Sequence, residues 1–447
     1  MNSILNNKIN KNSYLFVYFP STLVCLLPIL LITGPFLPDL AVSICSILFL
    51  INSCQKFNYF KKYYANIFFV IFLIFWITII IASLLSDYIL YSLSTSLPYI
   101  RFGIFPLSVW FLLDTNEKIF KYFFYSIVFA FFILTVDAYF QLFTGSNILG
   151  WKQIEIARVS SFFKDELILG SYLSRMLPIF IAFWIINNVF KKINLNISIV
   201  ILIIGIASAS LIFFSGERSA FFYLIFSYFI ILALSKYKKI IVYISIISII
   251  SIISIISKYH TESLNRIVSQ TIEQVMQTDP FLQEGKTSTN LTEKQFHINL
   301  FSVEHQYHYK SAFLMFQDNK LFGIGTKLFR KHCNEIKYKT SFESCSTHPH
   351  NTYVQLLAET GMAGFLVVVG IFCFLLYKLG RHFYLKLFLK KMLFSNFQIC
   401  LLSAIAITLW PLIPGGNFFN NWLSVVYYLP IGPLLWSFNA RSKYLKN

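Results

Sequence analysis

Long runs of apolar residues without a charge are the feature that most constrains this chain. Residues 64–85 read YANIFFVIFLIFWITIIIASLL and residues 241–257 read IVYISIISIISIISIIS, with no Asp, Glu, Lys or Arg in either. A helix of about 20 apolar residues crosses a bilayer core and satisfies its own backbone hydrogen bonds there. Because the runs are continuous rather than alternating, they predict helices and not a β-barrel. The predicted fold class is an all-α polytopic membrane protein, in agreement with a hydrophobic content of 57%.

We expect about twelve transmembrane helices. Their approximate ranges are 14–33, 37–54, 64–85, 93–113, 119–143, 167–190, 195–214, 217–235, 240–257, 351–378, 394–414 and 417–438. No small-residue cleavage site follows the first run, so we expect it to be retained as a helix.

The connections between these segments fall into two alternating sets. One set, at 34–36, 86–92 and 414–416, has no Lys or Arg. The other set is basic and comprises Lys8, Lys11, Lys56, Lys61, Lys62, Lys118, Lys121, Lys191, Lys192, Lys236, Lys238, Lys239, the stretch from Lys378 to Lys391, Arg441, Lys443 and Lys446. The positive-inside rule assigns the basic set and both termini to the cytoplasm. This topology also accounts for the net charge of +18, which in a soluble protein would suggest nucleic acid binding.

The same topology divides the chain into three parts. Residues 1–257 hold transmembrane helices 1–9, with a small external loop at 144–166; residues 258–350 form a large external loop; and residues 351–447 hold transmembrane helices 10–12. The large loop contains seven of the eight histidines, namely His260, His297, His305, His308, His332, His348 and His350. Polar chemistry is therefore expected on the outer face.

Charged residues inside or beside the predicted spans are candidates for function, because an intramembrane charge costs several kcal/mol unless it is paired or solvated. Arg218 lies at the outer end of a span in FFSGERSAFF, where its planar guanidinium suits a phosphate. Glu217 could orient or neutralise it, and the alternative is an interfacial arginine that snorkels to water. Asp137 and Arg175 are either functional residues or members of an ion pair that holds helices together.

Two histidines stand where the large loop meets the next span. Pro349 restricts His348 to an extended conformation, and Asn351 can cap the following helix. His350 is thereby held at a helix start and, with a pKa near neutrality, suits a general base. The alternatives are a zinc site, with HPH joined by HQYH at 305–308, or surface histidines without a role.

The cysteines divide by place in the chain. Cys333 and Cys345 both lie in the large loop, where an oxidising compartment would join them in a disulfide and a reducing one would leave two thiols. Those in or near the spans are interpreted as packing residues, and they are Cys25, Cys45, Cys54, Cys373 and Cys400.

These motifs together resemble the O-antigen ligase/O-antigen polymerase superfamily of bacterial envelope glycosyltransferases. His350-Asn351, nine further residues and then Gly361 and Gly364 are similar to the His-Asn-x9-Gly-x-x-Gly pattern of O-antigen ligases. FGIGTKLFR at 322–330 is similar to the Gly-x-Gly stretch that precedes this pattern, and GERSAFF at 216–222 to the start of a central span. Phe365 stands where the family has Thr.

The resemblance implies a reaction and its partners. The family transfers a glycan from undecaprenyl diphosphate, on the periplasmic face of the bacterial inner membrane, without a metal or other cofactor. The acceptor is lipid A–core for a ligase and a second lipid-linked repeat unit for a polymerase; we expect the former, with no nucleic acid partner. Inversion at the anomeric carbon is expected.

The resemblance also implies site residues. His350 corresponds to the family's base and Arg218 to one of two arginines that hold the diphosphate. His305 stands near the second arginine's place and is itself expected to bind the diphosphate or glycan. Either Arg330 or Lys310 substitutes for the second arginine, or the diphosphate is held differently. The further residues expected to bind the diphosphate or glycan are Arg158, Glu217, His348 and Asn351, and Gly361 and Gly364 are expected to be structural. A transporter of lipid-linked glycans is the rival class, but broken helices or paired half-repeats, which typify transporters, are not evident.

Overall fold

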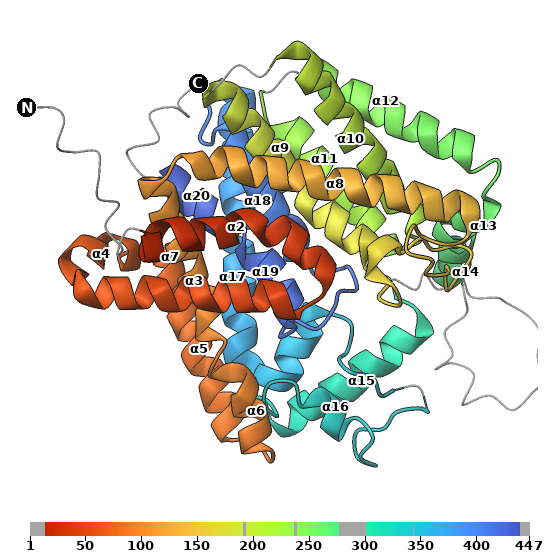
Figure 1. Cartoon of the computed structure of the whole chain (residues 1–447). Helices are drawn as coiled ribbons and strands as arrows, with labels where there is room; N and C mark the ends of the chain where they lie inside the picture. The colour runs from red at the N-terminus through yellow and green to blue at the C-terminus, as the bar shows by residue number, and fades with distance from the viewer. Residues whose placement is uncertain (1–13, 191–193, 237–238, 277–300, 343, 439–447) are drawn as a thin grey trace, which may run out of the picture.

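The computed structural model describes residues 14–190, 194–236, 239–276, 301–342 and 344–438, and its regular elements there are helices (Figure 1). In chain order they are η1 (Tyr14–Tyr18), α2 (Phe19–Leu30), η2 (Leu31–Thr33), α3 (Phe36–Gln55), α4 (Phe57–Tyr64), α5 (Ile67–Leu84), α6 (Ile89–Ser96), α7 (Ile100–Thr115), α8 (Lys118–Thr144), η3 (Ser161–Phe163), α9 (Leu169–Phe190), α10 (Leu195–Phe214), α11 (Arg218–Leu234), α12 (Lys239–Ile256), α13 (Thr261–Leu264), η4 (Asn265–Ser269), α14 (Gln270–Met276), α15 (Val303–Asp318), α16 (Phe329–His332), α17 (Thr352–Phe388), α18 (Asn396–Thr408), α19 (Asn421–Tyr428) and α20 (Ile431–Phe438).

The helices are those of a polytopic membrane protein. Within the described residues, eight helical segments are long and apolar enough to cross a bilayer, and three shorter apolar helices accompany them. Each predicted span coincides with a helix or with two consecutive helices; the last, 417–438, is divided into α19 and α20. His297 and the basic residues Lys8, Lys11, Lys191, Lys192, Lys238, Arg441, Lys443 and Lys446 lie outside the described residues.

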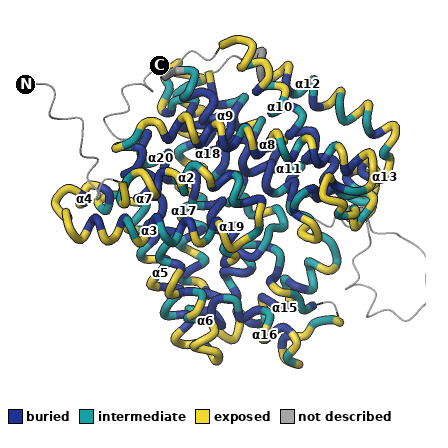
Figure 2. The backbone as a smooth tube through the Cα atoms, viewed as in Figure 1, coloured by how far each residue is buried: buried dark blue, intermediate teal, exposed yellow. Residues whose placement is uncertain are grey.

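Helix α8 illustrates why the outer surface requires lipid. Its exposed apolar residues recur every three or four positions and therefore share one face; they are Phe129, Phe132, Val136, Phe140 and Phe143. The opposite face is buried against α2, α9 and α10. Exposed segments likewise border the buried centre along α12 and α4–α6 (Figure 2). A row of phenylalanines on an outer face is stable in hydrocarbon and not in water.

The described ends of the chain lie away from the helices of the large loop. In Figure 1, the first turn of α2 and the last helix, α20, lie left of centre, whereas α13 and α14 are on the right and α15 and α16 at the lower right. Helix α15 packs on α17, and α16 contacts α17 as well. The large loop therefore rests on the part of α17 that directly follows the two histidines.

Helix α17 is interrupted at Gly361, where the backbone turns to φ 62° and ψ −164°. The loop 320–325 fills the break: Met362 N–H donates to the Lys320 carbonyl (2.8 Å) and Ala363 N–H to that of Leu321 (3.1 Å). In the other direction, Ile324 N–H donates to Ala358 (2.9 Å). The backbone groups freed by the break are thus paired with the Gly-x-Gly loop, which fixes that loop to the membrane helix.

Candidate functional site

A cavity of about 1770 Å³ lies where the outer ends of the membrane helices meet the large loop. Arg218 and His350 both line it. The other basic residues of its lining are Arg158, Lys164, Arg175, Arg266, Lys327 and Arg330, and the other imidazoles are His305 and His348. Residues separated by more than a hundred positions in the sequence therefore share one space.

Three arginines, Arg158, Arg218 and Arg266, form what we call the guanidinium cluster. Arg266 donates through Nε to the Gly216 carbonyl (3.1 Å) and lies 3.0 Å from a Glu155 carboxylate oxygen. Arg158 lies 3.6 Å from the other oxygen of Glu155. Burial, followed by the neighbouring Arg266, lowers the pKa of Arg158, and Glu217 and Glu155 oppose that shift. In the described residues, Glu155 is the carboxylate that pairs with Arg158 and Arg266. Such a site favours an anion.

Gly216 allows the cluster to assemble. Its φ is +67°, and a Cβ there would meet the Arg158 side chain at 2.6 Å and the Ala157 carbonyl at 2.8 Å. The GERS turn therefore needs glycine for both conformation and space. Arg218 follows as the first residue of α11, and its Nη2 donates to Gln270 Oε1 (3.3 Å). The prediction omitted Arg266 and Gln270, because a polar residue in a long external loop has no pattern that distinguishes it from a solvated one.

Glu217 has a different partner from the one expected. Its carboxylate accepts hydrogen bonds from the backbone amides of Gly170 (2.7 Å) and Ser171 (3.2 Å) at the start of α9. A carboxylate there is stabilised by the unpaired amides and the helix dipole. Glu217 thus joins the turn before α11 to α9, and this role positions Arg218 indirectly.

An ion pair between helices was one of two alternatives for Asp137 and Arg175, and neither residue forms one in the described part of the chain. Asp137 accepts hydrogen bonds from Ile148 N–H (2.8 Å) and the Ser161 hydroxyl, which hold the small loop. The Arg175 guanidinium bonds to Ser171 Oγ and lies over the rings of Tyr223 (4.6 Å) and Tyr427 (5.9 Å). Aromatic faces, rather than a carboxylate, stabilise this buried cation.

Four imidazoles gather at the mouth of α17. The His350 ring centroid lies 4.2 Å from that of His348, 5.3 Å from that of His305 and 5.5 Å from that of His308. His348 bonds through Nε2 to the Gly415 carbonyl (3.2 Å), and His305 through Nδ1 to Ser302 Oγ (2.7 Å). These bonds fix the rings on either side of His350. Within the described residues the His350 ring itself has no hydrogen-bond partner, which leaves its nitrogens available to a ligand.

The backbone around His350 is held from two directions. His350 has φ 56°, an uncommon value for a residue with a side chain, and its carbonyl accepts from Gly415 N–H (2.8 Å). Asn351 caps α17 by accepting from Tyr353 and Val354 N–H, as predicted, and donates to the Pro411 carbonyl (2.8 Å). The Asn351 amide is therefore occupied by the protein, and Asn351 does not line the cavity. Its expected contact with substrate has no support here.

The pKa values of His305, His348 and His350 are lowered below the ordinary value of histidine. Burial lowers the pKa of His350 to about 4, and His305 and His308 add to the shift. Burial, followed by His350, lowers the pKa of His348 to about 3. The expectation of a near-neutral pKa for His350 is therefore wrong, because burial and the imidazoles of His305 and His308 disfavour its charge.

Gly361 and Gly364 have structural reasons to be glycine. A Cβ on Gly361 would overlap the backbone of Leu321 and Phe322, and one on Gly364 would overlap Thr360. Gly323, with φ +69°, would place a Cβ 2.5 Å from the backbone of Glu359 and Thr360. The Gly-x-Gly and Gly-x-x-Gly motifs are thus the two sides of one close backbone contact.

Glu359, a buried carboxylate of α17, completes that contact. Its oxygens accept from Lys327 N–H (3.0 Å), Phe329 N–H (3.1 Å) and Gln355 Nε2 (2.9 Å). The segment that carries Lys327 and Arg330 is therefore bonded to α17 and directed into the cavity. Lys310 differs: it is exposed, five residues after His305 and so roughly 140° around α15. It does not line the cavity, and the expectation that it substitutes for the second arginine has no support.

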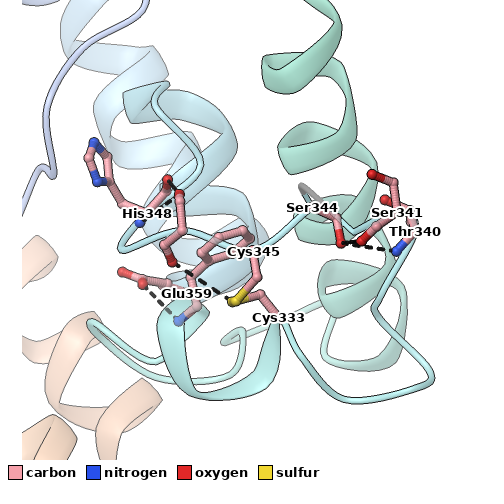
Figure 3. The surroundings of a disulfide bond; sticks show 9 residues. Cys333, Thr340, Ser341, Ser344, Cys345, His348 and Glu359 are labelled. Atoms are coloured by element: carbon pink, nitrogen blue, oxygen red, sulfur yellow. Dashed lines mark hydrogen bonds between the residues drawn. A yellow bond between two sulfur atoms is a disulfide. The ribbon is translucent and has the colours of Figure 1, made fainter. Parts of the chain in front are cut away.

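Cys333 and Cys345 form a disulfide, with their Cα atoms 4.9 Å apart (Figure 3). The bridge joins the end of α16 to the loop that leads to His348. Figure 3 shows His348, Glu359 and the disulfide in one view. Among the described residues, no group of three or more His, Cys, Asp or Glu side chains could hold a metal ion.

Comparison with known protein families gives one match to this region. Residues 200–369 match the O-antigen ligase family, a range that begins in α10, includes Arg218, Arg266 and His350, and ends in α17. No curated protein matches the chain. The matched range contains most of the cavity's charged residues together with both glycine motifs, as the resemblance in the sequence implies. Residues 200–369 of this multi-pass membrane protein are therefore an O-antigen ligase family domain.

Proposed function

We propose that the protein is a glycosyltransferase that moves a glycan from undecaprenyl diphosphate to an acceptor hydroxyl on the outer face of the bacterial inner membrane. The observation that carries the proposal is the cavity that Arg218 and His350 share. In one cavity, a guanidinium can bind the leaving diphosphate while an imidazole without a hydrogen-bond partner in the described residues accepts the proton of the attacking hydroxyl. Family members of the O-antigen ligase and polymerase type act on lipid-linked glycans, which fits an opening at the membrane surface.

The guanidinium cluster is the proposed site of the donor's diphosphate. Arginine forks match phosphate oxygens in pairs, and in a cavity sheltered from water they stabilise the charge that develops on the leaving group. We assign the second diphosphate arginine to Arg266, in preference to Arg330, because Arg266 and Arg218 both border Gly216 and the η4–α14 segment. Gln270 and Glu217 position Arg218 without contacting the reacting atoms.

His350 is the proposed general base. The acceptor hydroxyl attacks the anomeric carbon, its proton passes to a ring nitrogen of His350, and the bond from carbon to the diphosphate oxygen breaks with inversion. Because the pKa of His350 is lowered to about 4 by burial, the ring is already neutral and ready to accept a proton at pH 7. A weak base is adequate here, since the diphosphate is a good leaving group and general-base catalysis contributes about 10²–10⁴-fold.

Three candidate functions differ in how well the structure supports them: ligase, polymerase and transporter. Ligation to lipid A–core is the first, polymerisation of repeat units the second, and the cavity fits both. The interruption of α17 at Gly361 is a feature that transporters also have. Its free backbone groups, however, are paired with the loop 320–325 rather than turned toward a ligand. That pairing favours an enzyme.

The test compares cationic variants with a matched control in purified protein. Arg218→Lys and Arg266→Lys should each raise the donor KM by at least about ten-fold, because a lysine cannot replace two charge-assisted hydrogen bonds. Lys331→Met, an exposed charge next to Arg330 and outside the cavity, should leave the rate unchanged. If the wild-type protein transfers no glycan from undecaprenyl diphosphate to either acceptor class, the proposed function is wrong.

A further inference from the structure

A second group of cations lines the cavity apart from the guanidinium cluster. Lys327 and Arg330 stand on the segment that joins the Gly-x-Gly loop to α16. In the described residues neither side chain forms an ion pair with a carboxylate, and the Nε of Arg330 is buried without a partner. The nearest carboxylate in this segment, Glu359, is occupied by two backbone amides and Gln355. Glu359 acts on both cations, and Asp39 on Lys327, only from beyond ion-pair distance, so both cations can still bind an anion that enters the cavity.

The segment is rigid, so the two charges do not simply turn away into solvent. Lys327 has φ 60°, an uncommon backbone conformation, and the hydrogen bond that its N–H donates to the Glu359 carboxylate maintains it. Gly325 N–H donates to the Glu359 carbonyl (3.0 Å), and the disulfide at Cys333 follows within one turn of α16. A cation held by several backbone bonds is a preorganised binding element rather than a mobile surface charge.

The second group lines the same cavity as the first and acts on a different histidine. The pKa of His348 is lowered by burial and by His350, and the charge of Arg330 adds to it. The pKa of His305 is lowered by burial and by His308 and His348, with Arg218 contributing. His350 contacts both rings, at 4.2 Å and 5.3 Å between centroids. Each of the two imidazoles beside the proposed base is therefore influenced by a different cationic group.

We propose that Lys327 and Arg330 bind a phosphate group of the acceptor near the hydroxyl that attacks. The inference rests on the proposed function, in which the guanidinium cluster already holds the donor's diphosphate. A base in the same cavity as two anion sites places the acceptor hydroxyl beside the donor's anomeric carbon when both sites are filled. The acceptor's charge then selects it over neutral glycans.

The experiment measures donor and acceptor kinetics separately in the purified full-length protein. The variants are Lys327→Met and Arg330→Met, which keep the apolar stem and the backbone bonds, with Lys331→Met as the control. Three acceptors are compared at saturating undecaprenyl-diphosphate glycan: phosphorylated lipid A–core, the same molecule after phosphatase treatment, and a second undecaprenyl-diphosphate repeat unit. Comparison of the first two acceptors tests a saccharide phosphate as the source of the anion, and the third acceptor tests a carrier diphosphate.

The expected result is a wild-type preference for one of the two phosphate-bearing acceptors. Each variant should raise the KM for that acceptor by about ten- to a hundred-fold, the loss of one charge-assisted hydrogen bond, and change the donor KM less than about two-fold. A rise in the donor KM instead, or an equal change for charged and dephosphorylated acceptors, overturns the inference while leaving the glycosyltransferase proposal intact. Thermal unfolding of each variant shows whether a loss is due to misfolding, and a double Lys327→Arg, Arg330→Lys variant, which keeps both charges, must then retain the preference.

Discussion

Replacing Gly361 by alanine should destabilise the contact between α17 and the Gly-x-Gly loop. The backbone at Gly361 has φ 62°, where an alanine costs about 1–2 kcal/mol. Its Cβ would overlap the backbone of Leu321 and Phe322, which can retreat only by breaking the hydrogen bonds that Met362 and Ala363 donate. Each of those bonds contributes about 1 kcal/mol. The expected loss is therefore about 3–4 kcal/mol.

Thermal unfolding of the purified protein in detergent, followed by tryptophan fluorescence, measures this loss. Gly361→Ala should lower the Tm by roughly 5 °C or more, and glycan transfer should fall as Lys327 and the histidines move. Gly370→Ala is the matched control, because it lies in the same helix and its Cβ would meet no atom within 4 Å. An alanine there should be neutral or slightly stabilising. If Gly361→Ala unfolds within about 1 °C of the wild type, the contact does not have the strength argued here.

Two further predictions concern pH and redox state. The pKa values of His305, His348 and His350 are lowered from 6.5 to about 4, 3 and 4, chiefly by burial, so protonation favours the unfolded chain. The contribution of these histidines to stability should be fully present above about pH 6.5 and should be lost as the pH drops toward 4. A measurement of Tm against pH should show this fall, and a smaller fall in His348→Phe. A Tm that rises on acidification contradicts the assignment. Loss of the Cys333–Cys345 disulfide, by reduction or by Cys345→Ser, should cost about 3 kcal/mol for a loop of this length and lower the Tm. Cys373→Ser, at an exposed free thiol, should leave the Tm unchanged. An unchanged Tm after complete thiol labelling of Cys333 shows that the bridge is dispensable.

The sequence was sufficient for the helices because lipid imposes a simple rule on them. A span must be apolar over about 20 residues, and of the twelve predicted spans eight helical segments in the described residues have that length and composition, with three shorter apolar helices beside them. It was also sufficient for the backbone motifs, since Gly361, Gly364 and the Asn351 cap depend on local sterics and hydrogen bonds. The division of the last span into α19 and α20 was not predicted, although it has a local cause: Pro430 stands between the two helices and has no N–H to continue the first.

The site was harder to predict because its contacts are formed between distant segments. Arg218 and His350 had motifs that identify them, whereas Arg266 acquires its place only when η4 packs against Gly216. Glu217 was expected beside the Arg218 guanidinium, but the unpaired amides of α9 compete for its carboxylate. The pKa of His350 was misjudged because burial and the imidazoles of His305 and His308 lower it, which neighbours in sequence cannot reveal.

The central claim, that a guanidinium and a neutral imidazole in one cavity act on the same transfer, is tested most directly by single-turnover kinetics of His350→Ala. With the donor prebound, the variant should transfer its glycan about 10²–10⁴-fold more slowly than the wild type. Its affinity for undecaprenyl diphosphate should stay within about two-fold, because the guanidinium cluster is unchanged. A near-normal transfer rate, or a loss of donor binding equal to the loss of rate, contradicts the account.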